Sequence, residues 1–329
     1  MHEVRVDGQM TEKDEKLRHV MGDVLAKGMR RSLEVSWLML KIYVPVSLLT
    51  VVMKQWGILD FIVPFFTPFM GLMGLPGEAA ITVVAGFVNT IYAALATISA
   101  FDLTARQITV LGVVLGLSHS LFVETAILTK LRMATVRIAL FRMAAAFLAG
   151  MLMNAILPQK LGGTVTPYKS GGEAFSWLLT IQNIAFTSFR IVIIITLLMV
   201  LHEMAARWKH SAAIKAKLQL LPKAVGMSEK VFAPWMVGFF IGITYGAAVL
   251  LQLVKDHQLS HKDACLITIF LCLAHAIIED TVIFAIVGGN FWWVIVSRVS
   301  MAVLTVRLLS LGDLYRRFLW VGLPRKMIQ

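Results

Sequence analysis

The sequence predicts an all-α, multi-pass membrane protein, and composition and segment length are the two observations behind this. Hydrophobic residues make up 58% of the 329 residues and charged residues only 15%, with a mean hydropathy of +0.78. Soluble globular chains contain roughly 45–50% apolar residues, Gly included, and about 25% charged residues. Several apolar segments also reach the roughly 20 residues that a transmembrane helix needs. An ordinary soluble protein is therefore excluded.

The net charge and the cysteines limit which partners and cofactors can be expected. Lys and Arg number 31 against 19 Asp and Glu, which gives a net charge of +12. In a membrane protein such an excess is typical of cytoplasmic loops, so we expect no nucleic-acid partner. Cys265 and Cys272 stand seven residues apart, about 10 Å along a helix, which is too far for a disulfide. No cofactor is expected.

The first 36 residues predict a cytoplasmic amphipathic segment on the membrane surface, before the first span. Within 11–36, charged residues alternate with apolar residues near helical spacing. The apolar set is Leu17, Val20, Met21, Val24, Leu25 and Met29. A solvated basic tail is the alternative. The run of bases before any long apolar segment excludes a cleaved signal peptide of ordinary form.

The apolar segments that follow differ in their suitability as straight spans. Those long enough to cross a bilayer are 37–57, 78–100, 132–157, 177–201, 233–254 and 291–311. Segments 108–128 and 264–287 are also long enough, but each carries a histidine and acidic residues, so re-entrant or broken helices compete with full spans. The second has no Gly or Pro in its middle to favour a break. Segment 58–73 contains Pro64 and Pro68 and predicts an interfacial or broken helix.

An internal repeat is the strongest signal in the sequence. At an offset of 156 residues, four polar residues inside apolar segments align with four of the same or similar type. The aligned pairs are His119 with His275, Glu124 with Asp280, Thr125 with Thr281, and Arg142 with Arg298. The two copies cover roughly 41–157 and 189–311. Because polar residues are rare in such segments, chance is a poor explanation.

Charge placement favours inverted copies over parallel ones. If every apolar segment except 58–73 crosses the bilayer, the copies are parallel and the basic loop 202–230 lies outside, against the positive-inside rule. If the two histidine-bearing segments enter and leave on one side, the copies are inverted and this loop is cytoplasmic. We therefore favour the inverted arrangement, in which both chain termini are also cytoplasmic.

The predicted organisation has five parts. Residues 1–36 form the cytoplasmic segment, 37–157 the first membrane repeat and 158–176 an outer loop. Residues 177–311 form the second repeat, which contains the cytoplasmic loop 202–230, and 312–329 form a cytoplasmic tail.

Polar residues inside the apolar segments are the candidates for a substrate or ion site, because burying them in a membrane is costly. They are His119, Glu124, Thr125, Arg142, His275, Glu279, Asp280, Thr281 and Arg298. Histidine can bind a cation, relay a proton or hydrogen-bond a solute. His275 and Glu279 are four residues apart and would share one helical face. A purely structural role is the alternative, with the acids paired to Arg142 and Arg298. Whether a metal binds is unknown.

Two short motifs carry a family resemblance. Residues 74–78 (GLPGE) precede a span of small residues, and 102–107 (DLTARQ) precede an apolar segment interrupted by polar residues, with counterparts in the second copy. This arrangement resembles the nucleoside-recognition, or Gate, domain family. That family includes spore maturation proteins A and B, the membrane part of the ferrous iron transporter B, and relatives of concentrative nucleoside transporters. The resemblance implies a bacterial inner-membrane protein that moves a solute.

The leading hypothesis is an inner-membrane permease for a small solute, with a central polar site built from the duplicated His and acid residues. Its partners would be the lipid bilayer and a small solute or ion. The alternatives are an intramembrane enzyme acting on a lipid or lipid-linked substrate, and a non-transporting membrane partner subunit. Assembly as a homo-oligomer or with a membrane partner stays open.

Overall fold

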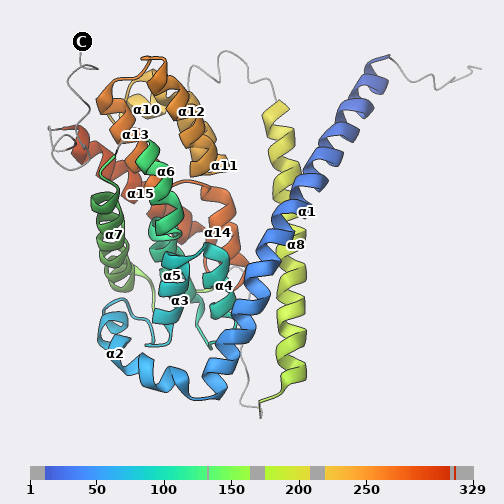
Figure 1. The fold of residues 1–329 in the computed structure, drawn as a ribbon, viewed down its shortest axis with the longest axis vertical. Helices are drawn as coiled ribbons and strands as arrows, with labels where there is room; N and C mark the ends of the chain where they lie inside the picture. The colour runs from blue at the N-terminus through green and yellow to red at the C-terminus, as the bar shows by residue number, and fades with distance from the viewer. Residues whose placement is uncertain (1–11, 132, 164–174, 208–218, 312–314, 316–329) are drawn as a thin grey trace, which may run out of the picture.

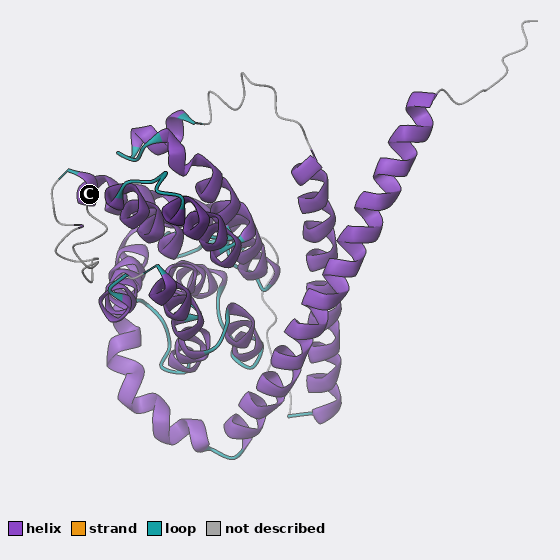
Figure 2. Ribbon diagram, turned by 45° about the horizontal axis from the view of Figure 1, so that its top comes forward, coloured by secondary structure: helices purple, strands orange, loops and turns teal. Residues whose placement is uncertain are grey.

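The computed structural model describes residues 12–131, 133–163, 175–207, 219–311 and 315, and it confirms the all-α fold class. Two long helices, α1 (Glu12–Gln55) and α8 (Trp177–Arg207), lie side by side at one edge of the molecule (Figure 1). The remaining helices form a bundle beside them (Figure 2). The described chain contains six helical stretches long and apolar enough to cross a membrane. The tail 312–329, most of the loop 158–176 and the middle of the loop 202–230 lie largely outside the described residues.

The long helix α1 joins the expected surface segment and the first expected span in one continuous helix. Its 44 residues extend about 66 Å at 1.5 Å per residue, roughly twice the thickness of a bilayer core. The helix is continuous because nothing in 12–36 breaks it, and α8 packs along it. Gly28 lies directly against Val200, and Thr196 Oγ1 donates to Ser32 Oγ at 3.2 Å.

The first part of the bundle contains six helices. They are α2 (Ile58–Leu72), α3 (Ala79–Val88), α4 (Ile91–Ile98), α5 (Ala105–Ser118), α6 (Leu121–Lys130) and α7 (Thr135–Ile156). The second part contains α10 (Leu220–Ala224), the short 3₁₀ helix η1 (Glu229–Val231), α11 (Phe232–Ile241), α12 (Ile243–Lys255), α13 (His261–Leu273), α14 (Ile277–Ile286) and α15 (Phe291–Ser310).

Two segments expected to be straight spans are broken. Segment 78–100 divides into α3 and α4 at Asn89 and Thr90, where the backbone of Thr90 is extended (φ −141°, ψ 167°). Segment 233–254 divides into α11 and α12 at Gly242, whose φ of 129° is accessible to glycine alone without strain. Apolarity alone did not reveal these breaks, because residues on both sides of each break are apolar.

The two histidine-bearing segments are broken, as one of the two predicted alternatives required. The chain leaves helix α5 at His119 and enters α6 after Ser120, and it leaves α13 at Ala274 and enters α14 after Ala276. Ser120 and Ala276 both have left-handed backbones, with φ of 49° and 43°. Neither is glycine, so the surrounding packing must hold these conformations.

Neighbouring helices satisfy the backbone groups that the breaks release. The N–H of Ser120 donates to the carbonyl of Gly86 in α3 at 2.8 Å, and the N–H of Ala276 donates to the carbonyl of Gly238 in α11 at 3.2 Å. Non-helical backbone at membrane depth is tolerated only when protein or water satisfies it. At each of these two breaks, the carbonyl of one particular glycine therefore accepts the hydrogen bond of the freed N–H.

The two halves run in opposite directions at their breaks. In Figure 1 the chain rises from α5 to α6 and descends from α13 to α14. Both α5 and α13 also start with a side-chain cap, in which Thr104 and Ser260 accept from the N–H three residues on. Inverted copies require this relation, but the repeat assignment and its membrane sides stay a prediction.

Candidate functional site

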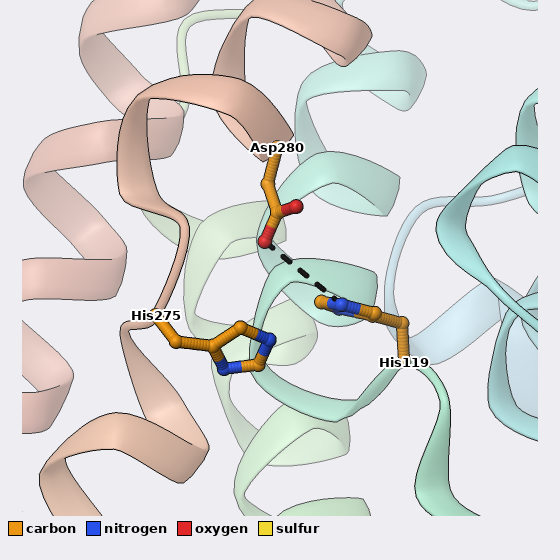
Figure 3. Close-up of side chains that lie close together, drawn as sticks. All are labelled: His119, His275 and Asp280. Atoms are coloured by element: carbon orange, nitrogen blue, oxygen red, sulfur yellow. Dashed lines mark ion pairs between the residues drawn. The ribbon is translucent and has the colours of Figure 1, made fainter. Parts of the chain in front are cut away.

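The helix breaks bring histidines and acids from both halves of the chain together. Figure 3 shows the rings of His119 and His275 and the carboxylate of Asp280 directed toward one another. The two imidazole centroids are 5.0 Å apart. All three side chains are buried. Two residues that lie 156 positions apart in the sequence are thus neighbours in space.

Two arginines pair with the acids of the same half. Arg142 Nη1 of α7 lies 2.6 Å from Glu124 Oε2 of α6, in an ion pair whose angles are not those of a hydrogen bond. Arg298 Nη2 of α15 donates to Asp280 Oδ2 of α14 at 3.0 Å. Both arginines have an exposed fraction of 0%. Both guanidinium groups are therefore buried in the bundle and paired with an acid.

The same arginines also hold the broken backbone. Arg142 Nη2 donates to the carbonyl of His119 at 3.2 Å, and Arg298 Nη2 donates to the carbonyl of His275 at 3.0 Å. A carbonyl at the end of a helix lacks its usual intrahelical donor. Each arginine therefore supplies a donor to one break and a counter-charge to one acid.

Each histidine lies close to an acid of the other half of the chain. His275 Nε2 lies 3.3 Å from Glu124 Oε1, and His119 Nε2 lies 3.5 Å from the same oxygen and 4.0 Å from Asp280 Oδ2. On the opposite side of each ring, Nδ1 faces a backbone carbonyl, that of Leu115 at 2.8 Å and that of Leu271 at 2.6 Å. We call His119, Glu124, Arg142, His275, Asp280 and Arg298 the central cluster.

Glu279 does not behave as the helical spacing predicted. Because Ala276 breaks the helix between His275 and Glu279, the two do not share a regular helical face. Glu279 accepts a hydrogen bond from Tyr92 Oη of α4 at 2.6 Å instead. Tyr92 was not among the candidates named from the sequence, since a tyrosine within an apolar segment is usually a packing residue.

The two threonines also differ. Thr125 is half-exposed, and its hydroxyl donates to the carbonyls of Leu121 and Phe122 within its own helix. Thr281 is fully buried, and Thr281 Oγ1 has no hydrogen-bond partner among the described residues.

Several buried polar atoms at the breaks have no partner in the described part of the chain. They are Ser118 Oγ, Thr281 Oγ1, and Nε and Nη1 of Arg298. Buried polar groups without partners cost free energy and are uncommon in native structures. The two hydroxyl groups can donate to or accept from water or a solute, and the two guanidinium nitrogens can donate to one.

Gly112 and Gly116 of α5 allow close packing against α15. A Cβ added at Gly116 would lie 2.4 Å from Cδ of Arg298, and one at Gly112 would lie 2.9 Å from Val294. The small residues therefore let the Arg298 side chain reach Asp280 across the face of α5.

A metal ion is not assigned to the central cluster. His119, His275 and Asp280 each offer a ligand atom, and these atoms lie within 4.8 Å of one another. However, Arg298 already pairs with Asp280, and Arg142 lies close to Glu124. A divalent cation would add charge beside two buried guanidinium groups, which is electrostatically unfavourable.

The chain is similar to a known protein family and to a known membrane protein. The family model described as "Gate: Nucleoside recognition" matches residues 36–158. A Bacillus subtilis (strain 168) protein named "Uncharacterized membrane protein YvoD" is 29% identical over 297 residues, which cover 86% of this chain and 93% of that protein. No solved structure matches the chain. Residues 36–158 are therefore similar to the Gate family, and the chain is a multi-pass membrane protein.

Proposed function

We propose that this protein is a permease of the bacterial inner membrane for a small solute, with both chain termini in the cytoplasm, and that the central cluster and the adjoining helix breaks form its binding site. The observation that carries the proposal is the set of unpartnered buried polar atoms at the breaks, Ser118 Oγ, Thr281 Oγ1 and two nitrogens of Arg298. Polar groups inside membrane segments usually mark substrate or ion pathways.

The arrangement of broken helices also favours transport. Discontinuous helices that meet near the middle of a bundle recur in secondary transporters, where they place backbone and side-chain polar groups around a solute. Four apolar segments of this chain are broken in this way, at Asn89, His119, Gly242 and His275.

An intramembrane enzyme that binds a lipid phosphate is less well supported. Its phosphate would need a guanidinium charge that no carboxylate already balances, but Arg142 is paired with Glu124 and Arg298 with Asp280. A phosphate beside them would place a further negative charge next to two buried carboxylates, which is costly.

Uptake by reconstituted vesicles tests the proposal. The family description names nucleoside recognition, so radiolabelled uridine and adenosine are the first probes, followed by other small polar solutes. With a substrate identified, we expect His275→Ala and His119→Ala to reduce uptake at least tenfold. His257→Gln changes an exposed histidine and serves as the control. Unchanged uptake in both cluster variants, at equal amounts of reconstituted protein, would falsify the proposal.

A further inference from the structure

We propose that the central cluster binds one proton, shared between the histidine Nε2 atoms and the Glu124 carboxylate, and that this proton is the coupling ion of the permease. The inference rests on the proposed function for its role in coupling. The presence of the proton is argued from hydrogen-bond polarity and charge and does not depend on transport.

The backbone carbonyl beside Nδ1 of each ring shows which nitrogen of a neutral imidazole carries the hydrogen. Nδ1 of His119 is 2.8 Å from the Leu115 carbonyl, and Nδ1 of His275 is 2.6 Å from the Leu271 carbonyl. A carbonyl oxygen only accepts, so Nδ1 carries the hydrogen in both rings. In a neutral imidazole protonated at Nδ1, the other nitrogen, Nε2, is a bare acceptor.

The Nε2 atom of each ring, an acceptor, then faces a second acceptor, the Glu124 carboxylate. Glu124 Oε1 lies 3.3 Å from Nε2 of His275 and 3.5 Å from Nε2 of His119. An ionised carboxylate also only accepts. Three groups with lone pairs and no hydrogen would converge in a buried space, where repulsion is poorly screened. One proton, on either Nε2 or on the carboxyl oxygen, turns this contact into a hydrogen bond.

Charge balance favours a single proton over a divalent cation. The charged groups of the central cluster are the guanidinium groups of Arg142 and Arg298 and the carboxylates of Glu124 and Asp280, which balance when both histidines are neutral. The half-buried carboxylate of Glu279 lies beyond them, against Tyr92. One bound proton adds a single positive charge to this space, whereas a divalent cation would add two.

The other titratable groups beside the cluster do not change this sum. Tyr92 Oη donates to Glu279 and is neutral while it does so. The Cys272 thiol of α13 is buried, and a thiol is uncharged at neutral pH. The rings of the two histidines are 5.0 Å apart, so a second proton would place two cations side by side.

Movement of the two halves during transport would also change the binding of this proton. It bridges His275 of the second half and Glu124 of the first half. Any movement that separates the α13/α14 break from α6 would break this hydrogen bond and leave the proton without its acceptor. Its binding is therefore tied to the relative position of the two halves.

Nitrogen NMR of the full-length protein in lipid bilayers, labelled with ¹⁵N-histidine and treated with a chelator, tests for the proton without a transport assay. We expect, at neutral pH, one histidine ring protonated on both nitrogens, whose signals are lost in His275→Gln or His119→Gln and persist in His257→Gln. If the proton instead resides on the acid, infrared spectroscopy will show a carboxylic-acid band that disappears in Glu124→Gln; this outcome also supports the proposal.

Two neutral rings beside fully ionised carboxylates in the wild-type protein would overturn the proposal. So would a stoichiometric metal in the purified protein that shifts the Nε2 signals of both rings. The coupling role is tested by adding an identified substrate to vesicles that contain a pH-sensitive dye: internal acidification should accompany uptake, and its absence would overturn coupling. The proposed function can survive each of these failures, because it depends on solute uptake and not on the proton.

Discussion

His275 Nε2 faces Glu124 Oε1 at 3.3 Å, so a histidine from the second half of the chain contacts the acid of the first half. Arg142 holds the same acid from its other side, at 2.6 Å. Glu124 is therefore the one group that contacts an arginine and both histidines of the cluster. Removing its charge should affect stability and transport together.

Glu124→Gln should destabilise the protein because it leaves the Arg142 guanidinium buried without a counter-charge. Breaking a buried ion pair by neutralising one partner costs about 3–5 kcal/mol. Thermal unfolding of the purified protein in detergent should show a lower midpoint. Lys27→Ala removes an exposed ion pair with Asp23 at 3.1 Å, which contributes at most about 1 kcal/mol, and is the control. An unchanged midpoint in Glu124→Gln would show that Arg142 is stabilised by its carbonyl contacts alone.

Gly116→Ala should displace the Arg298 side chain. The added methyl group would lie 2.4 Å from Cδ and 2.5 Å from Nε of Arg298, and overpacking of this kind costs about 1–3 kcal/mol. We expect a lower unfolding temperature and reduced uptake, because the ion pair with Asp280 depends on the same side chain.

Gly71→Ala is the matched control for this change. Gly71 also lies within a helix, but a Cβ there would meet nothing within 4 Å. Alanine is a better helix former than glycine by about 1 kcal/mol, so this variant should be equally or more stable. Equal effects of the two substitutions would contradict the role assigned to Gly116.

Tyr92→Phe should separate the contribution of the Glu279 hydrogen bond from that of the aromatic ring. The hydroxyl donates to Glu279 Oε1 at 2.6 Å, and a hydrogen bond to a charged group contributes about 1.5–3 kcal/mol. We expect lower stability and altered uptake. Tyr245→Phe changes an exposed tyrosine and should behave like the wild type in both assays. A Tyr92→Phe variant with normal stability and uptake would reduce Tyr92 to a packing residue.

The sequence predicted the fold class and all six members of the central cluster, because polar residues are conspicuous within apolar segments. His119, Glu124, Arg142, His275, Asp280 and Arg298 were all found in this way. It did not predict that each histidine would face an acid across the two halves, since that depends on how α6 and α14 pack.

The breaks were only partly predictable. The segments containing His119 and His275 were marked by their polar residues, whereas the breaks at Thr90 and Gly242 lie in segments that read as ordinary spans. The break after His275 uses Ala276 with φ of 43°, a conformation that no local propensity favours. Its stability comes from the Gly238 carbonyl and from Arg298, which are distant in sequence.

The membrane orientation of the loop 202–230 decides between inverted and parallel copies. Lys223→Cys places a thiol at an exposed position of this loop, and Lys160→Cys places one in the predicted outer loop. The native Cys265 and Cys272 are buried, which limits background reaction. In intact cells a membrane-impermeant maleimide should label Lys160→Cys at once and Lys223→Cys only after the membrane is permeabilised, because basic loops are retained in the cytoplasm. Labelling of Lys223→Cys in intact cells would make the copies parallel, and the opposite chain directions at the two breaks would then need another explanation.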